Sequence, residues 1–145
     1  MGSGNPGHTP HHKKAEKYEN GNWSDIPDAP VASKLSHYAV IFNAGNFYYF
    51  GGSLGYPDNT IRSLSAATWT WSEVGRLNAA RYGHGVILVD NNFMIVGGDG
   101  DYKHNEVCHL NNGQFTCEQK TSRLTNFYGS QILFRVSENY EICSN

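Results

Sequence analysis

Two cysteines stand symmetrically about the strongest turn signal in the sequence. Cys108 and Cys117 flank Asn112-Gly113, a dipeptide that favours a two-residue hairpin turn between antiparallel strands. A turn centred there pairs Cys108 directly with Cys117, at a non-hydrogen-bonded position where the Cα atoms lie about 4.5 Å apart. That separation is at the short end of the range for a disulfide. The spacing therefore predicts a cross-strand disulfide; the alternative is two small buried thiols.

The cysteines also bear on location. A structural disulfide is typical of oxidising compartments, so the pair favours an extracellular or secreted protein. Asn22-Trp23-Ser24 is in addition an N-glycosylation sequon. The polar residues at the start contain no apolar core of the kind a signal peptide needs, which taken alone points to the cytoplasm. Cys143 has no predicted partner in the chain, and an odd cysteine in a secreted protein suggests pairing across chains or with a missing segment.

The strands expected to position the cysteines belong to a block of sequence that recurs along the chain. Two apolar segments joined by a turn occur at residues 37–52 and 84–98, and a third copy begins at residue 131. His37, His84 and Gln131 are each 47 residues apart. A fixed period in this range indicates one supersecondary unit that is copied and stacked on its neighbours.

The segments within each block have the composition of strands. They are short, rich in β-branched and aromatic residues, and bounded by Asn-, Asp- and Gly-containing turns. Their apolar runs are nearly continuous, as in strands covered on both faces. No capped segment with helical period is present, so we expect an all-β fold. Strands are predicted near residues 20–26, 36–42, 47–51, 60–65, 69–74, 83–89, 93–97, 105–110, 115–119, 130–136 and 139–143.

A set of residues recurs in register within these blocks. Gly51-Gly52 and Gly97-Gly98 end corresponding strands, Trp71 lies 19 residues after the first pair, and Arg81-x-x-His84 opens the next block. Together these marks resemble the kelch motif over roughly residues 18 to 143. The resemblance implies β-propeller blades, each a four-stranded antiparallel sheet.

The resemblance also divides the chain. Closed propellers have at least about four blades, so we expect an incomplete ring in one chain: either a piece of a larger propeller, or a subunit that completes its ring as a homodimer. The expected segments are a disordered or tag-like tail (1–17), the outer strand of an incomplete blade with its link (18–34), two kelch blades (35–81 and 82–124) and the first hairpin of a further blade (125–145).

In kelch blades, residues that recur in every blade are expected to have a structural role within the blade. His37 and His84 occupy one place in the repeat, so we expect both to be structural, for example in a hydrogen bond between strands. A hairpin centred on Ala66-Ala67 places Arg62 opposite Trp71. In the same register, Cys117 takes the position where kelch blades carry their packing Trp, so the disulfide is expected to replace that side chain.

The resemblance implies a non-catalytic module that binds a protein partner through loops at one end of the propeller. Aromatic and Arg side chains make good anchors, and the candidate contacts are Tyr56, Tyr102, His104 and Arg123. The alternative is a carbohydrate-active or carbohydrate-binding propeller, similar to galactose oxidase or to sialic-acid epimerases.

Other functional classes find little support in the sequence. No catalytic, cofactor or metal constellation can be assigned, and His8, His11 and His12 lie in a Gly- and Pro-rich tail. A net charge of −2 without a basic stripe argues against nucleic acid. No apolar stretch approaches the length of a membrane span.

Overall fold

The computed structural model describes residues 15–31, 36–100 and 104–121. All regular structure in these ranges is antiparallel β-sheet, without helix, so the all-β class is confirmed. The strands are β1 (Ala15–Glu19), β2 (Asn22–Ile26), β3 (Ala39–Asn43), β4 (Asn46–Ser53), β5 (Pro57–Ser65), β6 (Trp71–Arg76), β7 (Arg81–Tyr82), β8 (Gly85–Val89), β9 (Asn92–Val96), β10 (Asp99–Gly100), β11 (His104–Asn111) and β12 (Gln114–Thr121). The described residues contain no helix long and apolar enough to cross a membrane.

Two four-stranded sheets carry most of the structure. Sheet 1 has the order β3-β4-β5-β6, and sheet 2 has the order β8-β9-β11-β12. Two-residue turns at Ala44-Gly45 and Asp90-Asn91 close the first hairpin of each sheet, with positive φ at all four residues. Such turns match the twist of the strands they join. Each sheet is therefore built from neighbouring strands that follow one another along the chain.

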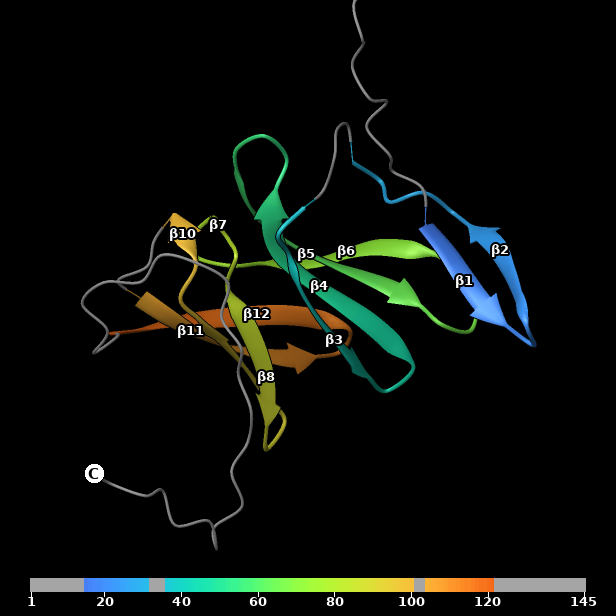
Figure 1. Cartoon of the computed structure of the whole chain (residues 1–145). Coiled ribbons are helices and arrows are strands. Elements are labelled where there is room, and N and C mark those ends of the chain that lie inside the picture. The colour runs from blue at the N-terminus through green and yellow to red at the C-terminus, as the bar shows by residue number, and fades with distance from the viewer. Residues whose placement is uncertain (1–14, 32–35, 101–103, 122–145) are drawn as a thin grey trace, which may run out of the picture.

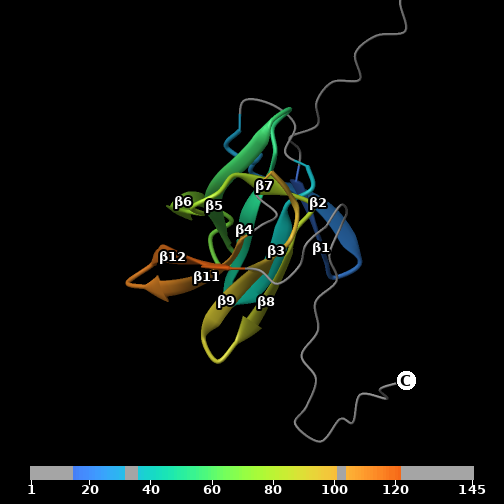
Figure 2. The same cartoon turned by 90° about the vertical axis from the view of Figure 1, so that its left-hand side faces the viewer.

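The two sheets stack with corresponding strands adjacent. β3 contacts β8 at one margin of the stack, and β6 contacts β12 at the other. β7 and β10 form a short ladder at the top of the stack, and the β1–β2 hairpin lies on the side of sheet 1 away from sheet 2 (Figures 1 and 2).

An aromatic cluster fills the space between the sheets. Tyr48 and Phe50 of β4 meet Phe93 of β9 and Phe115 of β12, and all four are buried. Their ring centroids lie between 4.9 Å (Phe93–Phe115) and 5.9 Å (Tyr48–Phe93) apart. Contacts of this kind add about 0.5–1.5 kcal/mol each beyond the burial of apolar area. Sheet 1 is thus held to sheet 2 mainly by rings.

Glycines allow the backbones to approach where the sheets meet at their upper ends. Gly51 has a φ of 54°, and a Cβ there would lie 2.7 Å from the carbonyl oxygen of Arg81. Gly98 has a φ of 92°, and its Cβ would lie 2.8 Å from the carbonyl oxygen of Tyr82. Gly51 and Gly98 therefore mark places where the backbone of residues 81–84 approaches closely.

The N-terminal part of the fold differs from the expectation. Residues 18–26 were expected to form one outer strand after a tail at 1–17, but β1 begins at Ala15 and pairs with β2. Asn20 and Gly21 both have positive φ and close this hairpin. The segment therefore supplies two strands, because an Asn-Gly turn divides it. The strands expected at 130–136 and 139–143 lie outside the described residues.

Replacing Gly51 with alanine is expected to lower the free energy of unfolding by about 2–3 kcal/mol, because a left-handed backbone and a steric overlap penalise the new Cβ. Gly45→Ala is the matched control: its φ is also positive, 80°, but nothing lies within 4 Å of the added Cβ. It should cost only about 1 kcal/mol. Chemical denaturation measures both, and equal losses would show that the backbone at Arg81 does not approach Gly51 closely.

Candidate functional site

The loop end of the stack gathers three segments of the chain. The β4–β5 turn (53–57), the link between the sheets (77–83) and the short strand β10 lie together at the top of the molecule (Figure 1). Leu77 donates its backbone N–H to the Asn59 carbonyl at 2.7 Å, and β7 pairs with β10. We call this region the loop end; it is the candidate binding surface.

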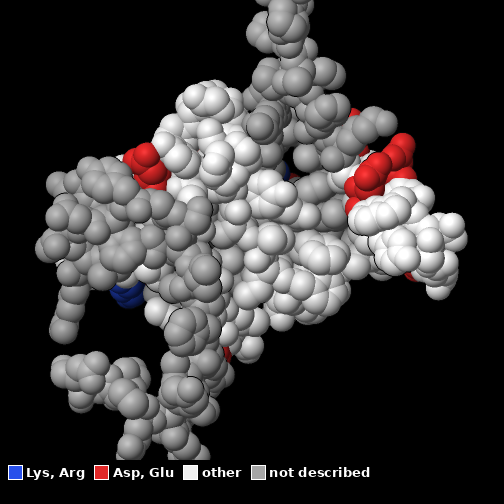
Figure 3. All heavy atoms as spheres, in the orientation of Figure 1, with Lys and Arg blue, Asp and Glu red and all other residues white. Residues whose placement is uncertain are grey.

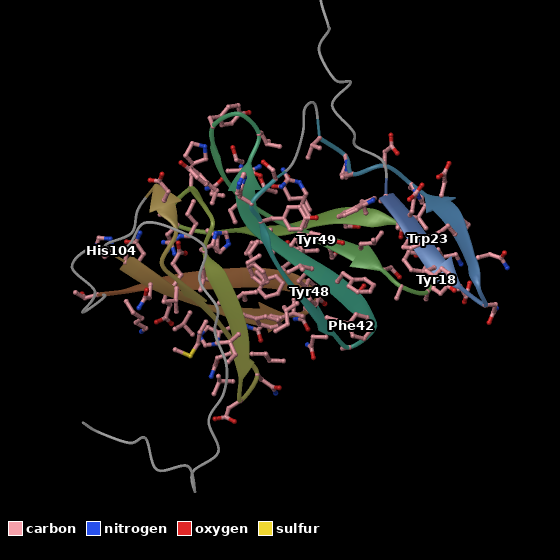
Figure 4. All side chains as sticks on the ribbon, viewed as in Figure 1. Tyr18, Trp23, Phe42, Tyr48, Tyr49 and His104 are labelled. Atoms are coloured by element: carbon pink, nitrogen blue, oxygen red, sulfur yellow. A yellow bond between two sulfur atoms is a disulfide. The ribbon has the colours of Figure 1, made fainter. Side chains whose placement is uncertain are left out.

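Two of the four predicted contact residues are among the described residues: Tyr56 in the loop end and His104 in β11. Tyr56 is 65% exposed, in a turn that the Leu54 N–H closes by donating to the Tyr56 carbonyl at 3.0 Å. His104 is half-buried at the start of β11, and its carbonyl accepts a hydrogen bond from Arg81 (Figure 4). Tyr102 and Arg123 lie outside the described residues. Tyr56 is therefore an exposed aromatic side chain on the described part of this surface.

A buried ion pair fixes the link behind the loop end. The Arg81 guanidinium donates from Nη2 to Oε1 of Glu106 at 3.0 Å, and both side chains are fully buried. Arg81 Nη1 also donates to the Gly97 carbonyl at 3.1 Å and to the His104 carbonyl at 2.8 Å. The Arg81 side chain thus ties the link to β9 and β11.

The Glu106 carboxylate completes this network from sheet 2. It accepts the backbone N–H groups of Asn78 at 2.7 Å and Ala79 at 3.1 Å, together with the Asn78 side-chain amide at 3.1 Å. Buried charges are tolerated when they are paired and hydrogen-bonded in this way. The repeat residue Arg81 thus has a structural role, whereas its partner Glu106 was not predicted from the sequence.

Sheet 1 contains a second buried ion pair. Arg62 Nη1 lies 2.6 Å from Oδ2 of Asp58, whose other oxygen accepts from the Thr60 hydroxyl and backbone N–H. Asp58 is buried in β5, just after the β4–β5 turn. This pair holds the base of the β4–β5 turn that carries Tyr56.

The predicted register around Trp71 is wrong. Arg62 was expected opposite Trp71, but Leu64 lies opposite Trp71 and Arg62 pairs with Glu73. The turn is longer than two residues, since the Ser65 N–H donates to the Thr70 carbonyl at 3.0 Å. The indole N–H of Trp71 donates to the Pro27 carbonyl at 2.8 Å.

In the observed register, Cys117 occupies the same position in sheet 2 as Trp71 does in sheet 1. Phe47, Leu64 and Trp71 are successive cross-strand neighbours in sheet 1. The corresponding series in sheet 2 is Phe93, Cys108 and Cys117. The predicted pairing of Cys108 with Cys117 is confirmed, with their Cα atoms 4.0 Å apart and a disulfide between them. The bond stands where sheet 1 carries its tryptophan.

Three potential metal ligands adjoin the disulfide. The ligating atoms of Glu106, Cys108 and Cys117 lie within 4.8 Å of one another. Both sulfurs are bonded to each other, and a metal would need free thiolates. Glu106 already accepts hydrogen bonds from the link. With the disulfide formed, this cluster is structural.

The two repeat histidines differ in their surroundings. His84 is buried between Gly51 and Gly98, whereas His37 is exposed with a φ of 54°. Among the described residues, neither ring nitrogen of His84 has a hydrogen-bond partner of good geometry, so the expected strand-bridging bond is not seen there. Burial lowers the His84 pKa from 6.5 to about 4; the Arg81 charge adds to the shift and the Phe50 carbonyl opposes it. His84 is therefore a neutral side chain that fills the space between Gly51 and Gly98.

No family model matches this chain, and no curated protein matches it at a significant level.

Glu106→Gln is expected to lower the free energy of unfolding by about 3–5 kcal/mol, because it leaves the Arg81 charge buried without its counter-ion. The matched control is Glu73→Gln, which removes the exposed ion pair with Arg76 and should change stability by less than about 1 kcal/mol. Denaturant titration measures both. A loss no greater than that of the control would mean that the buried pair does not hold the link.

Acidification should weaken the fold through His84. Its folded pKa of about 4 lies below the unfolded value of 6.5, so between these values the unfolded chain binds more protons. This contribution to stability is intact above pH 6.5 and declines as the pH falls, by about 3 kcal/mol at pH 4. Thermal unfolding across this range should show the decline in the wild type and in His109→Asn, but not in His84→Leu. An unchanged slope in His84→Leu would contradict the assignment.

Proposed function

We propose that this chain is a non-catalytic, kelch-type interaction module that binds a protein partner at its loop end. Two four-stranded sheets stacked with corresponding strands adjacent support the kelch-type reading. The repeated residues Gly51, Arg81, His84 and Gly98 all lie at the junction of these sheets. A motif whose members meet at one junction is typical of a stacked repeat.

The observation that carries the proposal is an exposed aromatic side chain on a fixed support. Tyr56 is the most exposed large side chain of the loop end, and the Asp58–Arg62 pair anchors the strand that follows it. A rigid aromatic residue loses little conformational entropy on binding, which makes it a good anchor for a protein partner.

The described part of the loop end favours binding over catalysis. The Asp99 carboxylate accepts the Tyr82 hydroxyl, which raises the pKa of Tyr82. The Asp58 carboxylate forms a buried ion pair with Arg62. Copper chemistry of the galactose oxidase kind needs a cysteine crosslinked to tyrosine, and Cys108 and Cys117 are bonded to each other. The disulfide further supports our proposal that the module works in an oxidising compartment.

Partner capture with matched variants tests this function. Tyr56→Ser should weaken binding of the captured protein at least about tenfold, because it truncates the anchor. Tyr18→Ser is the control: it removes an equally exposed tyrosine (62% against 65%) from the β1–β2 hairpin. Equal binding by all three proteins would exclude the loop end. Copper uptake with turnover of a sugar would instead establish the carbohydrate-active alternative.

A further inference from the structure

We propose that Asn22, beside the turn of the β1–β2 hairpin, is an acceptor site for an N-linked oligosaccharide. This inference rests on the oxidising compartment proposed above, because N-linked sugars are added in the endoplasmic reticulum, where disulfides also form. It does not depend on the binding of a partner at the loop end.

The sequence offers one place for such a sugar. Asn22-Trp23-Ser24 is the only Asn-x-Ser/Thr triplet in the sequence, and its middle residue is not proline, as an acceptor requires. Triplets of this kind also arise by chance. Whether this one can carry a sugar is therefore a question of its exposure and its conformation.

The whole triplet is exposed in the folded chain. The Trp23 side chain is 69% exposed, and its ring lies against that of Tyr18, with centroids 5.2 Å apart. Among the described residues, nothing lies within 4 Å of a Cβ added at Gly21, just before the triplet. In the space-filling view the hairpin stands out from the body of the molecule at the right (Figure 3). The folded chain therefore has space for a bulky polar group here.

The strand conformation of β2 presents the two essential side chains together. Asn22 and Ser24 are two residues apart in this strand, so their side chains point to one face and that of Trp23 to the other. Trp23 shares its face with Tyr18, its cross-strand partner. The Asn22 amide and the Ser24 hydroxyl therefore lie on one exposed face, and the indole does not stand between them.

The same positions stay exposed where the sheets stack. Trp23-Ser-Asp in β2 repeats Trp71-Ser-Glu in β6, and Cys117 is the equivalent in sheet 2 of Trp71. The residues on either side of these two equivalents are all exposed: Thr70, Ser72, Thr116 and Glu118. They remain so although β6 and β12 contact each other. By this correspondence, a further sheet stacked on the hairpin would leave Asn22 accessible.

The contact that Asn22 makes in its turn has a counterpart elsewhere. The Asn22 amide donates to the Asn20 carbonyl at 3.2 Å. Asn46, at the start of β4, donates to the Ala44 carbonyl at the same distance, but Phe47-Tyr48 follows it and completes no triplet. Asn46 therefore provides a matched control, because its replacement removes the same turn contact without changing an acceptor.

The modification is a transfer of the oligosaccharide from a polyisoprenyl diphosphate carrier. The Asn22 Nδ2 attacks the anomeric carbon of the first sugar, so that a C–N bond forms while the C–O bond to the diphosphate breaks. The amide loses one proton, and the carrier diphosphate leaves with the bonding electron pair. A cellular glycosyltransferase catalyses this step, and the chain supplies the acceptor amide.

Mass spectrometry of the secreted protein tests the site. The full chain is directed into the secretory pathway of a eukaryotic cell by a cleavable leader and purified from the medium. We expect added mass that peptide N-glycosidase removes, converting the modified Asn22 to aspartate. Asn22→Gln and Ser24→Ala should lose the added mass entirely, whereas Ser24→Thr and the control Asn46→Gln should keep it. Circular dichroism confirms that each variant folds.

A secreted wild-type chain with an unmodified Asn22 would overturn the proposal, as would added mass that persists in Ser24→Ala. Mapping the Cys108–Cys117 disulfide in the same sample separates this inference from the proposed compartment. A chain with the disulfide but without the sugar contradicts the acceptor site alone, whereas a chain with neither also contradicts the compartment. Tyr56→Ser should keep its sugar, so a failure of partner binding at the loop end leaves this result unchanged.

Discussion

Arg81 and Glu106 meet where no solvent reaches them, and the link between the sheets is folded around their contact. The arginine comes from β7 in the link, and the glutamate from β11, the third strand of sheet 2. Their hydrogen bonds satisfy backbone groups of residues 78, 79, 97 and 104. The junction glycines, the neutral His84 and the support of the loop end all depend on this arrangement, because each lies against the backbone that the pair holds.

The sequence predicted those parts of the fold that local chemistry determines. Asn112-Gly113 fixes a two-residue turn. Pairing the residues on either side of that turn one by one placed Cys108 opposite Cys117. Ala66-Ala67 has no such preference, so the longer turn before Trp71 was missed. Ala15–Glu19 is a polar strand without an apolar pattern, and its first three residues were assigned to a tail. Glu106 was missed because a buried ion pair joins residues that only the tertiary fold brings together.

The two sheets show two ways to fill one position. Sheet 1 places Trp71 beside Tyr49, with ring centroids 4.9 Å apart, and its indole reaches the preceding segment. Sheet 2 places Cys117 there and joins it to the neighbouring strand. A large side chain contributes packing between repeats, whereas a disulfide stabilises within one repeat by restricting the unfolded chain. At this position, therefore, sheet 1 is stabilised by a contact with its neighbour, whereas sheet 2 is stabilised by a bond within the sheet.

The chain has three tryptophans, and all of them lie on the β1–β2 hairpin or on the edge of sheet 1 that faces it. The aromatic cluster between the sheets contains only phenylalanine and tyrosine. Indole emission therefore observes the attachment of the hairpin and not the packing between the two sheets. The tryptophans thus provide a built-in spectroscopic label for one boundary of the molecule.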